Sequence, residues 1–444
     1  MGAGVATWSS PARWTTTSTH NQRGYRGQVT TPILTAAAVD AAAALLADVL
    51  PATPLQRSER LSAATGADVW LKREDLQPVR SYKLRGAFNF ISNLSDEERA
   101  KGVVAASAGN HAQGVAFAGQ RLGVRSRIYL PRNTPRQKRD RVAILGGDLV
   151  EVIVTGEVYD DAAKAAAEDA VRTGAVVVPA FDALDTMAGQ GTVAIEIVQQ
   201  LGRIPDLVTV PVGGGGLLGG MATWMAAHTA STRLVGVEPE GAASMAAALA
   251  AGTPVDLDEV SPFVDGAAVR RVGTLTHAAV AATGTHLTSV SEGALCVEML
   301  AMYQTDGIIA EPAGALATTV LADLRIEPGS TVVAVVSGGN NDVSRYAEIV
   351  EKALIHEGRK HYFTVDFPQE PGALRRFLDE VLGPDDDITF FDYIKRNNRD
   401  TGTAIVGLEL GDPDELGPLL ARMDASPLRI ERIPTDSPLF RLIG

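Results

Sequence analysis

The sequence predicts an α/β protein with parallel sheets, followed by a smaller α+β domain at the C-terminal end. Two observations predict this class. From residue 71 to about residue 179, runs of β-branched residues alternate with segments of helical periodicity, as parallel βαβ units require. After residue 354 the order becomes strand, helix, strand, strand, helix, strand. In the first region, strands are expected near residues 128–130, 149–154 and 175–178, and helices near 135–145 and 160–172.

Ordered structure is expected to begin near residue 31. The first 39 residues contain no acidic residue and are rich in threonine, serine and arginine, but they lack the amphipathic pattern of a transit peptide. We therefore interpret residues 1–30 as a disordered leader. A helix is predicted over residues 39–49, because alanine, which dominates there, has the highest helix propensity.

The composition excludes several kinds of partner. The 444 residues suffice for two or three domains, and the net charge of −13 argues against nucleic acid and does not favour anionic membranes. Cys296 is the only cysteine, so no intrachain disulfide can form and a reducing cytoplasm is the expected compartment. The histidines form no metal-like cluster, and no apolar run reaches membrane-spanning length.

The segment from Ser81 to Ala87 carries the strongest chemical signal. Lys83 follows Ser81 by two residues and lies at the expected start of a helix. Burial and the positive end of the helix both favour the deprotonated amine, which can form a Schiff base with an aldehyde cofactor. A lone lysine is more often a surface residue whose stem lies along an amphipathic helix. Three motifs further along the chain favour the catalytic interpretation.

The first motif is the loop from Ser107 to Gly114, between a β-branched run and a helical pattern. Small residues at a strand-to-helix turn expose backbone N–H groups toward an anion. Asn110 adds an amide that can bond a phenolic oxygen. By itself, the loop could equally be an ordinary turn with an N-cap.

The second motif is a glycine loop between a strand and a helix, where the backbone can wrap closely around a phosphate. It consists of Gly213, Gly214, Gly215, Gly216 and Leu217. An alternative is a dinucleotide-binding fingerprint formed by Gly214, Gly216 and Gly219. Glu238 would then be the acid that binds the ribose. That alternative describes a nicotinamide enzyme and leaves the lysine motif without a role.

The third motif, Ser337 to Asn341, closes the strand over residues 331–336. A hydroxyl at the carboxyl end of a strand projects into the crevice where α/β folds bind ligands. A plain loop is the alternative for this motif in isolation.

In this order, the segments resemble the fold-type II pyridoxal-phosphate enzymes over residues 54–354. The lysine motif, the Ser107 loop, the glycine loop and Glu311–Gly314 look like those of the threonine dehydratases. The resemblance implies elimination of L-threonine, and also L-serine, to a 2-oxo acid and ammonia. It also implies a catalytic domain over residues 31–354, with a small subdomain inserted at about 95–180.

The resemblance further implies roles for individual residues. Lys83 would hold the cofactor and remove the Cα proton, and Asn110 would bond the ring hydroxyl. Ser337 would face the pyridine nitrogen, and its neutral hydroxyl favours prompt elimination over a long-lived carbanion. The phosphate would be held by Gly213, Gly214, Gly215, Gly216 and Leu217. The substrate would contact Ser81, Ser107, Gly109, His111 and Glu311.

Two alternative functions remain at this point. One is a serine/threonine dehydratase-racemase of the same fold, but the serine racemases have a serine where this chain has Ala108, which cannot do acid–base work. The other is an amino-acid sensor that binds the cofactor without turnover. Retention of Lys83 and of every cofactor motif argues against the sensor.

The C-terminal region, residues 361–434, resembles one copy of the ferredoxin-like, ACT-like regulatory domains. Strands are expected near residues 361–367, 387–395 and 403–410, with helices ending near residue 382 and over 413–423. The resemblance implies inhibition by isoleucine, with valine opposing it, and a homotetramer. A purely structural dimerisation module is the alternative.

Overall fold

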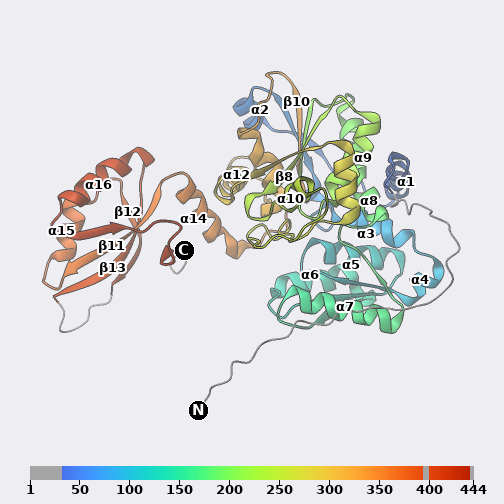
Figure 1. The fold of residues 1–444 in the computed structure, drawn as a ribbon, viewed down its shortest axis with the longest axis horizontal. Coiled ribbons are helices and arrows are strands. Elements are labelled where there is room, and N and C mark those ends of the chain that lie inside the picture. Colours follow the sequence, from blue (N-terminus) through green and yellow to red (C-terminus); the bar gives the residue numbers. More distant parts are fainter. Residues whose placement is uncertain (1–32, 394–399, 441–444) are drawn as a thin grey trace, which may run out of the picture. The chain divides into compact units, whose positions relative to one another are not determined.

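The computed structural model describes residues 33–393 and 400–440 of the chain. In these residues it contains three sheets, which are drawn with their helices in Figure 1. The expected leader, residues 1–30, lies outside the described residues. No helix in the described part of the chain is long and apolar enough to cross a membrane.

The largest sheet has six strands in the order β1-β2-β10-β7-β8-β9, and only β1 runs antiparallel to its neighbour. Alternate residues of β10 enter two different cores: Val332 and Val336 pack on one face and Val333 on the other. A strand buried on both faces is typical of a parallel sheet between two helical layers. The strands are β1 (Leu55–Arg57), β2 (Asp68–Arg73), β7 (Leu207–Pro211), β8 (Arg233–Pro239), β9 (His286–Val290) and β10 (Thr331–Val336).

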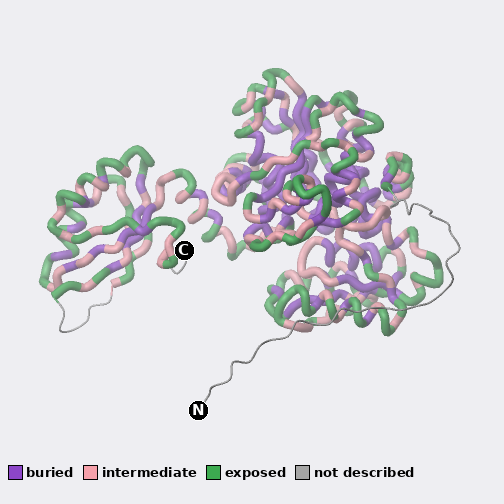
Figure 2. Tube along the Cα trace, viewed as in Figure 1, coloured by how far each residue is buried: buried purple, intermediate pink, exposed green. Residues whose placement is uncertain are grey.

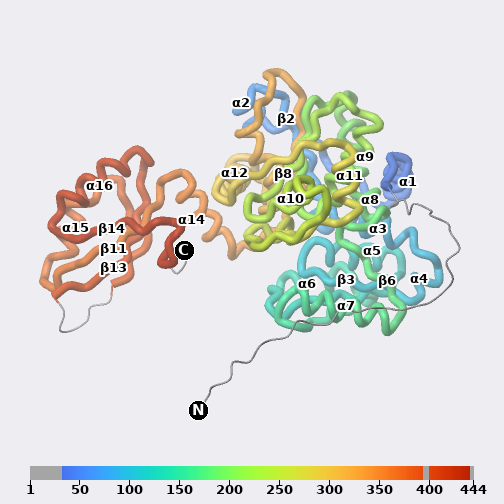
Figure 3. The backbone as a smooth tube through the Cα atoms, in the orientation of Figure 1, coloured from blue at the N-terminus to red at the C-terminus, as the bar shows by residue number. Residues whose placement is uncertain are grey.

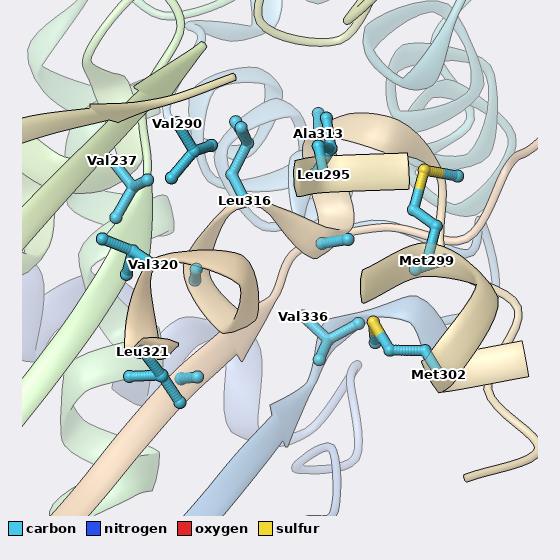
Figure 4. Close-up of a cluster of buried hydrophobic side chains, with 14 of the residues drawn as sticks. Val237, Val290, Leu295, Met299, Met302, Ala313, Leu316, Val320, Leu321 and Val336 are labelled. Atoms are coloured by element: carbon cyan, nitrogen blue, oxygen red, sulfur yellow. The ribbon is translucent and has the colours of Figure 1, made fainter. Parts of the chain in front are cut away.

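Helices cover both faces of this sheet. Helices α2, α12, α13 and α14 contribute to the core that Figure 4 shows, where Met302 lies beside Val336. Helices α1, α8, α9, α10 and α11 contribute to the other core. The expected alanine-rich helix is present as α1. The bounds are α1 (Ala36–Ala47), α2 (Glu59–Thr65), α3 (Lys83–Ser92), α8 (Leu184–Leu201), α9 (Gly216–His228), α10 (Ser244–Ala251), α11 (Thr274–Thr283), α12 (Glu292–Gln304), α13 (Pro312–Thr319) and α14 (Tyr346–His356).

A second, wholly parallel sheet has the order β5-β4-β3-β6 and comes from the chain between α3 and α8. Strands and helices alternate along this segment, as the sequence predicts. The elements are α4 (Asp96–Lys101), β3 (Val103–Ala106), α5 (Asn110–Leu122), β4 (Ser126–Leu130), α6 (Arg136–Gly146), β5 (Val150–Val154), α7 (Tyr159–Thr173) and β6 (Val176–Val177).

The third sheet is antiparallel, with the order β12-β13-β11-β14, and follows directly from α14 (Figure 3). Its two helices pack on it around a core that includes Phe363, Phe377 and Leu408, and the buried strand segments are visible in Figure 2. The elements are β11 (Lys360–Pro368), α15 (Ala373–Glu380), β12 (Asp387–Tyr393), β13 (Thr401–Glu409), α16 (Leu416–Ala425) and β14 (Arg429–Arg432). The predicted fold class is therefore confirmed, and the end of the strand expected at 387–395 lies outside the described residues.

Candidate active site

Three loops that carry the predicted motifs leave the same edge of the large sheet. Strands β2, β10 and β7 are parallel neighbours, so the segments that follow them lie side by side at their carboxyl ends. The backbone of Ser81 pairs with Gly338, and the Tyr82 N–H donates to the Ser337 carbonyl at 3.1 Å. The loop before Lys83 is thus joined directly to the loop after β10.

Lys83 is the first residue of α3. Its Nζ donates to the carbonyl of Ala180 at 3.0 Å. Burial lowers the pKa of the Lys83 amine to about 8, against the opposing attraction of Glu311. A large fraction of this amine is therefore neutral, and nucleophilic, near pH 8.

A buried charge network anchors the helix that carries Lys83. Arg85 donates to both Glu74 and Glu196, and Lys72 donates to Glu196 at 2.5 Å. Arg85 and Lys72 are at most 1% exposed. Sequence reasoning did not predict this network, because its members come from four separate elements.

The glycine loop follows β7 and ends at α9. Gly215, at φ 87°, occupies the left-handed region that favours glycine. A Cβ atom at Gly214 would lie 2.3 Å from the Phe181 ring, and one at Gly213 would lie 2.9 Å from the Ala267 Cα atom. Thr276 Oγ1 donates to the Gly214 carbonyl at 2.8 Å and holds the loop in place. Together with the first-turn N–H groups of α9, this backbone forms a cradle suited to a phosphate.

Glu238 does not have the role that a dinucleotide site would give it. Its carboxylate accepts hydrogen bonds from the N–H groups of Met245 and Ala246 at the start of α10. The side chain is 1% exposed, and burial raises its pKa to about 7. Because Glu238 serves as a buried helix cap, it is not free to bind a ribose, and the structure gives no support to the nicotinamide alternative.

Asn110 and Glu311 meet in this structure, although 201 positions separate them. Asn110 Nδ2 donates to Glu311 Oε1 at 2.6 Å. Burial, together with the negative charge of Asp265, raises the pKa of Glu311 to about 7, although the Asn110 bond works in the opposite direction. A carboxyl group of this kind can carry or accept a proton near neutral pH.

The loop that begins at Ser107 leads into α5, whose first N–H groups have no partner within the helix. The Gly109 N–H donates to Ser107 Oγ at 3.2 Å. His111 Nε2 lies 2.8 Å from the carbonyl of Val178, and burial lowers the pKa of His111 to about 4. The imidazole is therefore neutral and held by Val178, which leaves its backbone N–H as the group best placed to bind an anion.

The residues present fit pyridoxal phosphate. Ser337 Oγ donates to the carbonyl of Ala313 at 3.2 Å, and this proton can be redirected to a ring nitrogen. Ser81 Oγ is buried and has no hydrogen-bond partner within the described residues, so a polar group of a ligand could satisfy it. A buried amine, a phosphate cradle and a neutral hydroxyl are the groups that this cofactor requires.

The comparisons with known proteins agree with this geometry. Residues 46–338 match the family described as pyridoxal-phosphate dependent enzyme, and residues 351–443 match the C-terminal regulatory domain of threonine dehydratase. The chain is 61% identical to the biosynthetic L-threonine dehydratase of Mycobacterium tuberculosis, over 92% of this chain and 96% of the relative. It belongs to the biosynthetic threonine dehydratase family. It is accordingly a pyridoxal-phosphate enzyme of the lyase class.

Further relatives and solved structures extend the likeness. The biosynthetic L-threonine dehydratase of Bacillus subtilis is 46% identical, over 89% of this chain and 94% of its own. The processed form of threonine deaminase isoform 2 from Solanum lycopersicum is 39% identical, with a TM-score of 0.68 over 72% of this chain and 93% of its own. Maize serine racemase is 30% identical, with a TM-score of 0.67 over 73% of this chain and 99% of its own. The fold alone therefore does not separate dehydratases from racemases.

The structure adds residues to the site of this family member that sequence reasoning missed. Phe181 and Thr276 pack against the glycine loop. Asn340 contacts Asn110, and it lies within the motif that closes β10, so its position in that motif was the only signal in the sequence. The roles of the predicted site residues remain predictions that the geometry supports.

Proposed function

We propose that this protein eliminates water from L-threonine, and also from L-serine, and that water then hydrolyses the resulting enamine to a 2-oxo acid and ammonia. The product from threonine is 2-oxobutanoate. The observation that carries the proposal is the Lys83 amine, whose pKa is lowered to about 8, in a loop bonded to the Ser337 segment. Bound pyridoxal phosphate supplies the electron sink for a carbanion at Cα.

Lys83 both holds the cofactor and, once released from it, removes the Cα proton of the substrate. Its low pKa supports this role, because the neutral amine is the form that accepts a proton. Asn110 would bond the cofactor's ring hydroxyl, and Ser337 would face its ring nitrogen. The phosphate would be held by Gly213, Gly214, Gly215, Gly216 and Leu217.

The loop after β3 binds the substrate carboxylate. Ser107, Gly109 and His111 lie at the start of α5, where unpaired N–H groups and the helix dipole favour an anion. Glu311 then delivers a proton to the departing hydroxyl, which its raised pKa makes feasible near pH 7. Ser81, on the neighbouring loop, offers a buried hydroxyl to the same site.

The regulatory part of the proposal concerns residues 361–434, which we assign as a domain that binds isoleucine and lowers activity, with valine opposing it. The catalytic domain is assigned to residues 31–354, with its small subdomain at about 95–180. We further propose that the enzyme works in the cytoplasm as a homotetramer.

A pocket on the regulatory domain supports the effector assignment. It is an open hollow of about 530 Å³ between β11, β12 and the start of α15. Phe367, Leu374 and Phe391 offer apolar surface. Arg375 offers a positive charge for a carboxylate, and Glu370, which also pairs with Arg376, offers a negative charge for an ammonium. Gly372 begins the helix without a side-chain cap. A branched-chain amino acid has the complementary groups: an apolar side chain, an ammonium and a carboxylate.

The direct test is to add L-threonine to the purified holoenzyme and assay 2-oxobutanoate and ammonia. Borohydride reduction beforehand should attach the cofactor irreversibly to Lys83 and stop turnover. Recovery of the reduced cofactor on another lysine would refute the active-site assignment. Tight binding of threonine without any product would instead support the sensor.

A further inference from the structure

Asn340 joins three loops of the active site through one side chain. Its Nδ2 donates to Asn110 Oδ1 at 2.7 Å and to the carbonyl of Val79 at 2.8 Å. Asn110 begins the helix after β3, Val79 lies in the loop before Lys83, and Asn340 itself follows β10.

The contact determines which end of the Asn110 amide points into the site. Asn110 Oδ1 accepts from Asn340, and Asn110 Nδ2 donates to Glu311 Oε1 at 2.6 Å. The two ends of an amide have similar shape but opposite hydrogen-bonding character. While Asn340 donates to the oxygen end, the nitrogen end must face the interior of the site.

We propose that Asn340 is a positioning residue that holds the Asn110 amide with its N–H group toward the cofactor's ring hydroxyl. This inference rests on the proposed role of Asn110. An N–H donor favours the ionised form of a phenolic oxygen, whereas a carbonyl at the same place would disfavour it. Asn340 therefore sets the ionisation of the ring hydroxyl through Asn110.

The Asn340 side chain is not needed to hold the loop after β10 against the loop before Lys83, because backbone hydrogen bonds already join them. The Gly339 N–H donates to the Arg80 carbonyl at 2.9 Å, and the Tyr82 N–H donates to the Ser337 carbonyl. These bonds join the two loops without any side chain. Removing the Asn340 amide should therefore leave the loops in place and release the Asn110 side chain.

Asn340→Asp provides the sharpest test, because aspartate has nearly the same shape but no N–H group to donate. Asn110 would then have to turn its own N–H toward residue 340 and present its carbonyl to the cofactor. We expect cofactor affinity and kcat each to fall about tenfold or more. A pH titration followed by the visible absorption of the bound cofactor should show that its ring hydroxyl ionises at a higher pH than in the wild type. The Tm of the apoprotein should stay within a few degrees of wild type.

Asn341→Asp is the matched control. It introduces the same charge one residue away, and the Asn341 oxygen that accepts from the Asp342 N–H is retained as a carboxylate oxygen. This variant should keep the absorption spectrum and cofactor affinity of the wild type. Equal spectral shifts in both variants would overturn the proposal, because the charge alone would explain them.

A double variant separates this inference from the proposed role of Asn110. Asn110→Ala should shift the spectrum by itself, and adding Asn340→Asp should change it little further, since Asn340 acts through Asn110. A full additional effect in the double variant would overturn the inference while leaving Asn110 in its role. An unchanged spectrum in Asn110→Ala would overturn the role of Asn110, and this inference with it.

Discussion

Arg85 donates two hydrogen bonds of 2.8 Å to Glu74, and both side chains are at most 1% exposed. The same guanidinium bonds Glu196 at 2.7 and 2.8 Å. Arg85 lies two residues after Lys83 on α3, so the network fixes the helix that positions the reactive amine. Removing a cation from a buried carboxylate such as Glu74 is costly, and this predicts a large effect of substitution.

Replacing Arg85 with methionine should destabilise the apoprotein by about 3–5 kcal/mol, because the carboxylates of Glu74 and Glu196 would lose a buried cation. Urea-induced unfolding measures the change. Arg429→Met is the matched control: Arg429 and its partner Glu431 are both exposed, so the loss of stability should be far smaller. Equal losses in the two variants would contradict the structural importance of the network.

The reactivity of Lys83 in the apoprotein should rise with pH around a midpoint near 8. Burial lowers its pKa from the usual value to about 8, so the neutral amine accumulates at a lower pH than in an ordinary lysine. The initial rate of reconstitution with pyridoxal phosphate, followed by borohydride reduction and peptide mapping, would show this profile. Lys83→Ala should abolish the labelled peptide, and a midpoint near 10 would show that Lys83 is not desolvated.

Gly214→Ala should weaken cofactor binding about tenfold or more. The new Cβ atom would lie 2.3 Å from the Phe181 ring, so the loop or the ring must move and the phosphate cradle must change shape. Titration of the apoprotein with pyridoxal phosphate measures the affinity. Gly417→Ala is the control, because nothing lies within 4 Å of that Cβ position and alanine favours the helix. Unaltered affinity in Gly214→Ala would argue against the cradle.

Elimination should greatly exceed racemisation, because Ala108 cannot return a proton to the opposite face of Cα. Chiral chromatography of the products from L-serine would measure D-serine against pyruvate. Ala108→Ser should increase D-serine formation relative to wild type. Racemisation as the faster reaction of the wild-type protein would refute the dehydratase assignment in favour of the racemase.

Isoleucine should raise the threonine concentration required for half-maximal rate, with a coupling of about 1–3 kcal/mol. Leu378→Gln, at the 41% exposed rim of the pocket, should weaken this effect by making the apolar wall polar. Ile204→Gln, which is 47% exposed and lies outside the pocket, should not. Equal isoleucine sensitivity in the two variants would exclude this pocket as the effector site.

Truncation after Glu357 should leave an active enzyme that ignores isoleucine, provided that the shortened chain still assembles. Size-exclusion chromatography of the truncated protein is the control for assembly. If the intact, correctly assembled enzyme does not respond to saturating isoleucine, the domain is a structural module instead.

The sequence by itself determined the features that depend on local spacing. Strand and helix periodicities predict the parallel sheets and the C-terminal α+β domain, because side-chain direction repeats every two or 3.6 residues. The Lys83 motif, the glycine loop and Ser337 each follow an expected strand. Their order along the chain is the one that resembles the pyridoxal-phosphate enzymes. These signals need no knowledge of which strands are neighbours.

The tertiary structure alone decided which groups meet. Helix α5, which follows β3 of the second sheet, packs against α3, and this packing brings Asn110 to Asn340 and to Glu311, contacts that span more than 200 positions of the chain. Burial then sets the proton affinities, since desolvation lowers the pKa of Lys83 and raises that of Glu311. Neither long-range pairing nor desolvation leaves a periodic trace in the sequence, so the hydrogen-bonding and the ionisation of the site could be seen only in the folded chain.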